Sequence, residues 1–122
     1  MGRAGWAWVL DPHHGGQKVP PAIQKRTREQ VMRHAAKILP GKESWLRIRF
    51  QGPFCYLDAQ APGERGLRHL CRLRYFQGRD EWSMAFYTYS HERYKPCVFG
   101  SGKWFGTPQP ALDLVARYVE NA

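Results

Sequence analysis

Two stretches of the chain alternate arginine with residues that favour burial: WLRIRF at residues 45–50 and CRLRYF at residues 71–76. A period of two is typical of a β-strand that buries one face and leaves the other to water. The pattern therefore predicts two strands of an antiparallel sheet, with the arginines on the face opposite to the core.

Runs of this alternating character follow one another at residues 44–51, 54–60, 68–77 and 82–90. The segments between them contain Gly-Pro, Ala-Pro-Gly-Glu-Arg-Gly and Gly-Arg-Asp, which favour turns. This order predicts an antiparallel meander of four strands. Residues 94–99 can add a fifth strand, which Pro96 restricts to an edge of the sheet.

Two segments of helical character flank these runs. At residues 21–39, Ile23, Thr27, Val31 and Ala35 form one stripe, and a similar stripe predicts a second helix at residues 108–121. Residues 1–20 are expected to form a strand or arm and then a loop. Because 122 residues suit one domain, residues 1–122 are predicted to form a single α+β domain. An N-terminal and a C-terminal helix then cover one face of a four- or five-stranded antiparallel meander, which spans residues 44–99.

The register of the first predicted hairpin can be tested, because opposite residues in an antiparallel pair share a face. A two-residue loop at Gly52-Pro53 sets apolar residues against one another on one face. On the other face it sets Arg49 opposite Tyr56 and Arg47 opposite Asp58. One register thus sorts both strands, which supports the hairpin.

In the second hairpin, a four-residue loop at residues 78–81 likewise sets apolar residues against one another on one face and puts the arginines on the other. It sets Tyr75 opposite Met84 on the buried face and Arg72 opposite Tyr87 on the face away from the core, the open face. His69 and Cys71 are two residues apart, so both are predicted to face the core. There a thiol is an inert small hydrophobe, which disfavours a Cys-His nucleophile.

The charge balance restricts the partners of the open face. The chain carries 19 Lys and Arg against 10 Asp and Glu, a formal net charge of +9, and such an excess attracts polyanions. Arginines interleaved with aromatic rings are typical of surfaces that bind single-stranded nucleic acid, because guanidinium groups hold phosphates and rings stack on bases. We therefore predict a polyanion-binding module for RNA or single-stranded DNA. The predicted phosphate-holding residues are Arg47, Arg49, Arg72 and Arg74, and the predicted stacking residues are Tyr56, Tyr87 and Trp45.

Two other functions fit the same composition. His91, Arg93, Tyr94 and Lys95 cluster after the last long strand, and a small basic endoribonuclease with RelE-like chemistry would use such residues at a phosphodiester. Alternatively, the open face docks an acidic protein or a second copy of the chain and binds no nucleic acid, because exposed aromatic residues serve that role equally well. The sequence leaves both alternatives open.

Metal and cofactor sites are not expected. Cys55, Cys71 and Cys97 are odd in number and lack zinc-ligand spacing. Asp11, His13 and His14 form a small cluster, but adjacent histidines on a loop specify no metal. We find no pattern of a signal peptide or a membrane span, so a cytoplasmic protein without a membrane partner is expected.

Four segments, WVLDPHHGG, HLCRLRYF, WSMAFYTYS and YKPCVFGSG, resemble in this order a small uncharacterised bacterial protein family. The resemblance covers most of the chain. It implies a bacterial, cytoplasmic context, and it implies no site residue because no activity is established for that family.

Overall fold

The computed structural model describes residues 11–77 and 81–120. Of residues 1–20, for which a strand or arm and then a loop are predicted, residues 1–10 lie outside the described residues. Helix α1 (Pro21–Ile38) and a 3-10 turn (Glu43–Trp45) precede the sheet, and helix α2 (Pro108–Glu120) follows it. The strands are β1 (Leu46–Gln51), β2 (Phe54–Ala59), β3 (Arg68–Phe76), β4 (Glu81–Thr88), β5 (Arg93–Cys97) and β6 (Phe105–Gly106).

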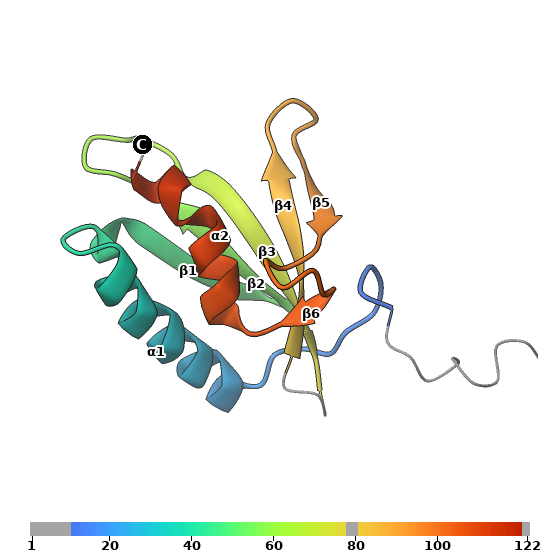
Figure 1. Ribbon diagram of the computed structural model, residues 1–122. Helices are drawn as coiled ribbons and strands as arrows, with labels where there is room; N and C mark the ends of the chain where they lie inside the picture. The colour runs from blue at the N-terminus through green and yellow to red at the C-terminus, as the bar shows by residue number, and fades with distance from the viewer. Residues whose placement is uncertain (1–10, 78–80, 121–122) are drawn as a thin grey trace, which may run out of the picture.

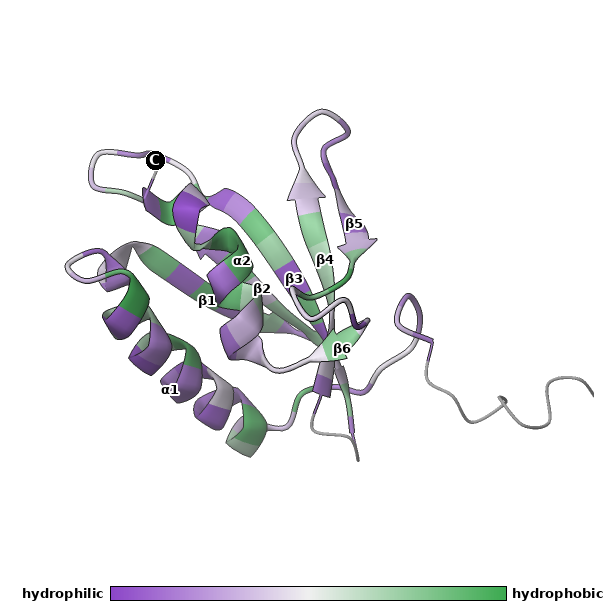
Figure 2. Cartoon of the chain, in the orientation of Figure 1, coloured by the Kyte–Doolittle hydropathy of each residue, from purple (hydrophilic) through white to green (hydrophobic). Residues whose placement is uncertain are grey.

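The sheet is the predicted antiparallel meander, with the spatial order β1-β2-β3-β4-β5. The short strand β6 pairs with β4 and was not predicted, because two residues carry no readable alternation. Both helices lie on the same side of the sheet (Figure 1). Apolar and polar residues alternate along β1 and β3 (Figure 2), which leaves one face of the sheet apolar for the helices.

The core lies between the helices and this inner face of the sheet. Val31 and Ala35 of α1 and Leu112 of α2 are fully buried against Leu57 and Leu73 of the strands. Burial of a side chain of this size contributes about 1.5–3 kcal/mol. The opposite face of the sheet, which we call the open face, carries no helix formed by residues 11–77 or 81–120 (Figure 1).

The first hairpin has the predicted register in every pair, from Gln51 opposite Phe54 to Leu46 opposite Ala59. Gly52 has a φ of 56°, the left-handed value that the first position of a type II′ turn requires. This hairpin therefore places Arg49 and Tyr56 side by side on the open face.

The predicted pairs of the second hairpin are wrong by two residues. Phe76 pairs with Glu81, so the four-residue loop is 77–80 and not 78–81. Tyr75 consequently faces Trp82 and their rings lie 5.0 Å apart; such an aromatic cross-strand pair stabilises a sheet more than the predicted pair with Met84. A shift of two by itself changes no face, so Arg72, Arg74 and Tyr75 keep their predicted faces.

The pairing of β2 with β3 contains an irregularity that the sequence did not predict. Leu57 pairs with Cys71, but the next residue, Asp58, pairs with His69, so Leu70 is an extra residue in β3. Leu70 is 4% exposed in the core, and His69 lies on the open face beside Asp58. The prediction that His69 faces the core is therefore wrong, because a bulge changes the alternation by one residue.

The segment before α1 crosses one end of the sheet. The backbone amide of Gln17 donates to the carbonyl of Tyr75 at 3.0 Å, and that of Val19 donates to Gly52 at 3.0 Å. Gly16 has a φ of 90°, and a Cβ there would lie 2.7 Å from the Tyr75 carbonyl oxygen. Only glycine fits this close approach. The segment thereby borders the open face near the end of β3.

In the described part of the chain, neither helix is long and apolar enough to cross a membrane.

Candidate functional site

The open face is strongly concave. The rings of Tyr56 on β2 and Tyr94 on β5 have centroids 5.6 Å apart, although β3 and β4 lie between their strands. On a flat sheet, three strand spacings would separate such residues by about 14 Å. The sheet therefore curls around its open face and brings side chains of non-adjacent strands into contact.

Three arginines share this concave face with aromatic rings. The guanidinium carbon of Arg49 lies 4.0 Å from the ring centroid of Tyr56. That of Arg72 lies 4.3 Å from the ring of Phe54 and 4.9 Å from the ring of Tyr94. Arg74 lies 4.7 Å from the ring of Phe54. We call Arg49, Arg72, Arg74, Phe54, Tyr56 and Tyr94 the arginine–aromatic cluster.

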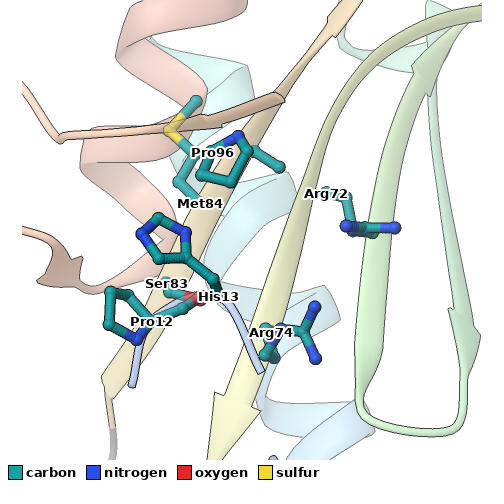
Figure 3. A pocket seen from close by; sticks show the side chains of 8 residues that line it. Pro12, His13, Arg72, Arg74, Ser83, Met84 and Pro96 are labelled. Carbon is teal, nitrogen blue, oxygen red and sulfur yellow. The ribbon is translucent and has the colours of Figure 1, made fainter. Parts of the chain in front are cut away.

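Arg72 and Arg74 lie side by side on β3 (Figure 3). Within residues 11–77 and 81–120, neither forms a salt bridge. The Arg74 Nη1 donates to the carbonyl of Gly15 at 2.9 Å. Burial, reinforced by the positive charge of Arg72, lowers the pKa of Arg74. Both arginines border a small cavity of about 30 Å³. An anion bound at the surface between them would relieve their mutual repulsion.

Some of the residues predicted to bind nucleic acid lie outside this cluster. Trp45 belongs to the 3-10 turn, packs against the hydrophobic core and has the ammonium group of Lys42 5.4 Å from its ring. Its predicted place on the open face is therefore wrong, because the 3-10 turn ends the strand alternation before Leu46. Arg47 donates to the carbonyl oxygens of Ser44 and Leu46 and takes no part in the cluster. The structure thus gathers Arg49, Arg72, Arg74 and Tyr56 and separates Trp45 and Arg47 from them.

Beside the cluster, a buried carboxylate holds an imidazole. Asp58 has no exposed side-chain surface, and its Oδ1 lies 2.8 Å from Nδ1 of His69, whose side chain is 34% exposed. The Arg49 Nε lies 3.6 Å from Asp58 Oδ2. We call Asp58 and His69 the Asp–His pair. It joins the arginine–aromatic cluster through their shared neighbour, Arg49.

Two buried polar atoms here have no hydrogen-bond partner among the described residues: Asp58 Oδ2 and the hydroxyl of Tyr94. Burial, reinforced by the charge of Asp58, raises the pKa of Tyr94 well above its ordinary value, so its hydroxyl remains protonated. Unpaired buried polar atoms are rare, because each lost hydrogen bond costs about 1–3 kcal/mol.

A cavity of about 140 Å³ borders His69 where β3 and β4 part. The pairing of these strands ends at Cys71 and Phe86. Beyond that point, the hydroxyl of Tyr89 bridges the gap by donating to the carbonyl of His69 at 3.2 Å. Tyr87, predicted to stack on bases, lies here with its ring 5.0 Å from that of His69. The cavity is lined by Arg68, His69, Leu70, Phe86, Tyr87, Tyr89 and Tyr118.

The structure does not bring together the residues of the alternative catalytic prediction. His91 is exposed in the turn between β4 and β5, where its Nδ1 lies 3.0 Å from Ser90 Oγ. Tyr94 contributes to the arginine–aromatic cluster, whereas its strand neighbours Arg93 and Lys95 are exposed and point to the other face by alternation.

The loop cluster at Asp11 forms a turn. The Asp11 carboxylate accepts from the backbone amide of His13 and contacts the ring of His14, each at 2.8 Å, and both contacts lower its pKa. In the described residues, no group of three or more His, Cys, Asp or Glu side chains is placed to hold a metal ion. Cys55 and Cys71 are fully buried, and burial raises the pKa of Cys55 to about 12. These thiols are therefore protonated and inert.

Comparisons with protein families, with curated proteins and with solved structures found no match for this chain. The functional interpretation consequently depends on the geometry of the open face.

Proposed function

We propose that the protein binds single-stranded nucleic acid on its concave open face, mainly through backbone phosphates. The observation that carries this proposal is the gathering of Arg49, Arg72 and Arg74 on one face. The one carboxylate paired with them in the described residues is the buried Asp58. An isolated positive face of this kind attracts a polyanion and holds it by charge.

Contacts with the rings prepare the arginines for phosphate. A guanidinium group that lies on a ring keeps its N–H groups pointing outward along its edge, where they can bind two phosphate oxygens. Because Phe54, Tyr56 and Tyr94 already fix these groups, binding costs less side-chain entropy. Because guanidinium groups already lie on these rings, the rings are less available for stacking on bases. Phosphate contacts therefore contribute more to the affinity than base stacking does.

The curvature of the sheet favours a single strand. The rings of Tyr56 and Tyr94 are in contact, with centroids 5.6 Å apart, although β3 and β4 lie between their strands. A flexible single strand can follow a face that is this strongly curved, whereas a rigid duplex contacts its rim only. We therefore expect single-stranded RNA or DNA to bind more tightly than a duplex of the same length.

Fluorescence anisotropy with a short labelled single strand, and with its duplex, tests the proposal. Arg72→Gln with Arg74→Gln removes two charges from the face. Lys25→Gln with Arg33→Gln removes the same charge from exposed positions on α1, on the helix side of the sheet. We expect the double substitution of Arg72 and Arg74 to weaken binding strongly, and that of Lys25 and Arg33 to leave binding nearly unchanged. Equal weakening by both pairs would show that binding follows net charge and not the open face.

A further inference from the structure

We propose that the Asp–His pair makes the open face a ribonuclease site, in which His69 removes a proton from the ribose 2′-hydroxyl of bound RNA. This inference rests on the proposed function, because the arginines must first hold the strand. It differs from the prediction based on His91, which lies exposed in the turn between β4 and β5.

The contact with Asp58 selects the tautomer that a base needs. Nδ1 of His69 lies 2.8 Å from Asp58 Oδ1, and in a neutral imidazole this contact places the ring proton on Nδ1 and the lone pair on Nε2. The carboxylate is fully buried and the imidazole is partly exposed. A buried carboxylate that orients an accessible imidazole is the arrangement that general-base catalysis uses. Asp58 is a positioning residue, because it acts through His69.

Phosphate-holding groups lie next to this imidazole. Arg49 contacts the same carboxylate at 3.6 Å, and Arg72 lies 4.9 Å from the ring of Tyr94, which in turn lies 6.3 Å from the ring of His69. A phosphodiester held by Arg49 and Arg72 would thus lie on the same part of the open face as His69. The same guanidinium groups can neutralise the charge that develops on the phosphate oxygens during the reaction.

The cavity beside His69 has room for one base. Its volume of about 140 Å³ is close to the roughly 150 Å³ of an engineered cavity that accepts benzene. A single-ring base therefore fits between Tyr87 and Tyr118, which border the cavity. A pyrimidine in this position would bring its own ribose to the imidazole at the mouth of the cavity.

The reaction is a transphosphorylation within the RNA strand. His69 Nε2 takes the proton of the 2′-hydroxyl, the 2′ oxygen forms a bond to the adjacent phosphorus, and the bond from phosphorus to the 5′ oxygen of the next nucleotide breaks. The leaving 5′ oxygen takes a proton from water, and the imidazolium then returns its proton to the hydroxide formed. The products are a 2′,3′-cyclic phosphate and a 5′-hydroxyl end. DNA is not cleaved because it lacks the 2′-hydroxyl.

The chain contains a matched control for this pair. His34 Nε2 lies 2.7 Å from Asp113 Oδ1, an imidazole–carboxylate contact of nearly the same length that joins α1 to α2 on the helix side of the sheet. His34 is partly buried, as His69 is. It has no place at the arginine–aromatic cluster. His34→Gln therefore controls for the loss of an imidazole–carboxylate contact as such.

The substrate is a DNA oligonucleotide with one ribouridine, labelled at one end and incubated with the whole protein in the presence of EDTA. Its analogue with 2′-O-methyluridine cannot react and measures binding. We expect wild-type protein and His34→Gln to cut after the ribouridine and to leave a cyclic phosphate. His69→Ala and His69→Gln should lower the rate by about 100-fold or more, a loss far larger than any weakening of their binding to the analogue. Added imidazole should restore part of the activity of His69→Ala, which no structural role of His69 would explain. Asp58→Asn should lower kcat and leave KM unchanged.

The outcomes separate the two proposals. Binding of the analogue without cleavage by wild-type protein would overturn the ribonuclease inference and leave the binding function standing. Cleavage that persists in His69→Ala, or that disappears in His34→Gln at unchanged folding, would also overturn it. Failure of the wild-type protein to bind the analogue would overturn the binding function itself.

Discussion

Neutralising Arg72 and Arg74 should change the salt dependence of nucleic-acid binding by a calculable amount. Each phosphate contact to a single strand contributes about 0.7 to the slope of log affinity against log salt. The open face offers three guanidinium groups, those of Arg49, Arg72 and Arg74. Three contacts predict a slope of about −2.1, and the single contact left after Arg72→Gln and Arg74→Gln predicts about −0.7.

These slopes give distinct affinity losses over an accessible range of salt. Between about 50 and 200 mM salt, a slope of −2.1 weakens binding about 18-fold, whereas a slope of −0.7 weakens it about 2.6-fold. The difference is measurable by anisotropy titration at several salt concentrations. It is also independent of the absolute affinity, which depends on the oligonucleotide.

The fold should survive this double substitution. Arg72 and Arg74 contact the rings of Phe54 and Tyr94, and such contacts contribute about 0.5–1 kcal/mol each at partly exposed sites. Urea denaturation therefore checks that a small loss of stability, and no unfolding, accompanies the change. Lys25→Gln with Arg33→Gln should retain the wild-type slope. A wild-type slope in the open-face variant, or the same reduced slope in both variants, would refute the assignment of phosphate contacts to this face.

Further predictions concern the fold that presents this face. Gly16→Ala should destabilise the protein by more than Gly15→Ala in urea denaturation. Both residues have positive φ, which costs about 1–2 kcal/mol for alanine, but only at Gly16 would the Cβ meet a backbone oxygen, at 2.7 Å. Equal losses of stability in the two variants would contradict this reasoning. Leu73→Ala should cost about 2–5 kcal/mol in the same measurement, because Leu73 is fully buried, and a loss below about 1 kcal/mol would refute its place in the core. Burial raises the pKa of Cys55 from 9.0 to about 12, so between pH 9 and 12 the unfolded thiol ionises while the folded one stays neutral, and stability should fall as the pH rises. Cys55→Ala should make this alkaline decline less steep, and an unchanged decline would assign it to other groups.

The faces of the strands could be predicted from the sequence even where the pairing could not. The second hairpin is shifted by two residues from its predicted register. Because side chains alternate with a period of two, such a shift preserves both faces, and Arg72 and Arg74 remained on the open one. The loop length alone could not fix the register, since the ring contact between Tyr75 and Trp82 decides it.

The wrong placements share one physical cause, a break in the alternation. The 3-10 turn rotates Trp45 away from the open face, and the extra residue Leu70 turns His69 toward it. Neither break has a signal in the pattern of apolar and polar residues, because each changes the backbone and not the composition. The contact of Phe54 with Arg72 has no sequence signal for a different reason: a short hairpin loop predicts the cross-strand neighbours of its own two strands, whereas this contact joins β2 to β3 across the longer segment 60–67.

The bulge and the curl together explain why Asp58 is the centre of the candidate site. The first hairpin places Asp58 on the open face, where a carboxylate in a flat sheet would meet water. The curl brings Tyr94 over this region, and Asp58 has no exposed surface. A buried carboxylate must be paired, because an isolated charge in this environment costs several kcal/mol. The bulge supplies the partner by turning His69 out of the core to within 2.8 Å. The irregularity that breaks the alternation therefore also positions the imidazole, with its Nδ1 held against Asp58.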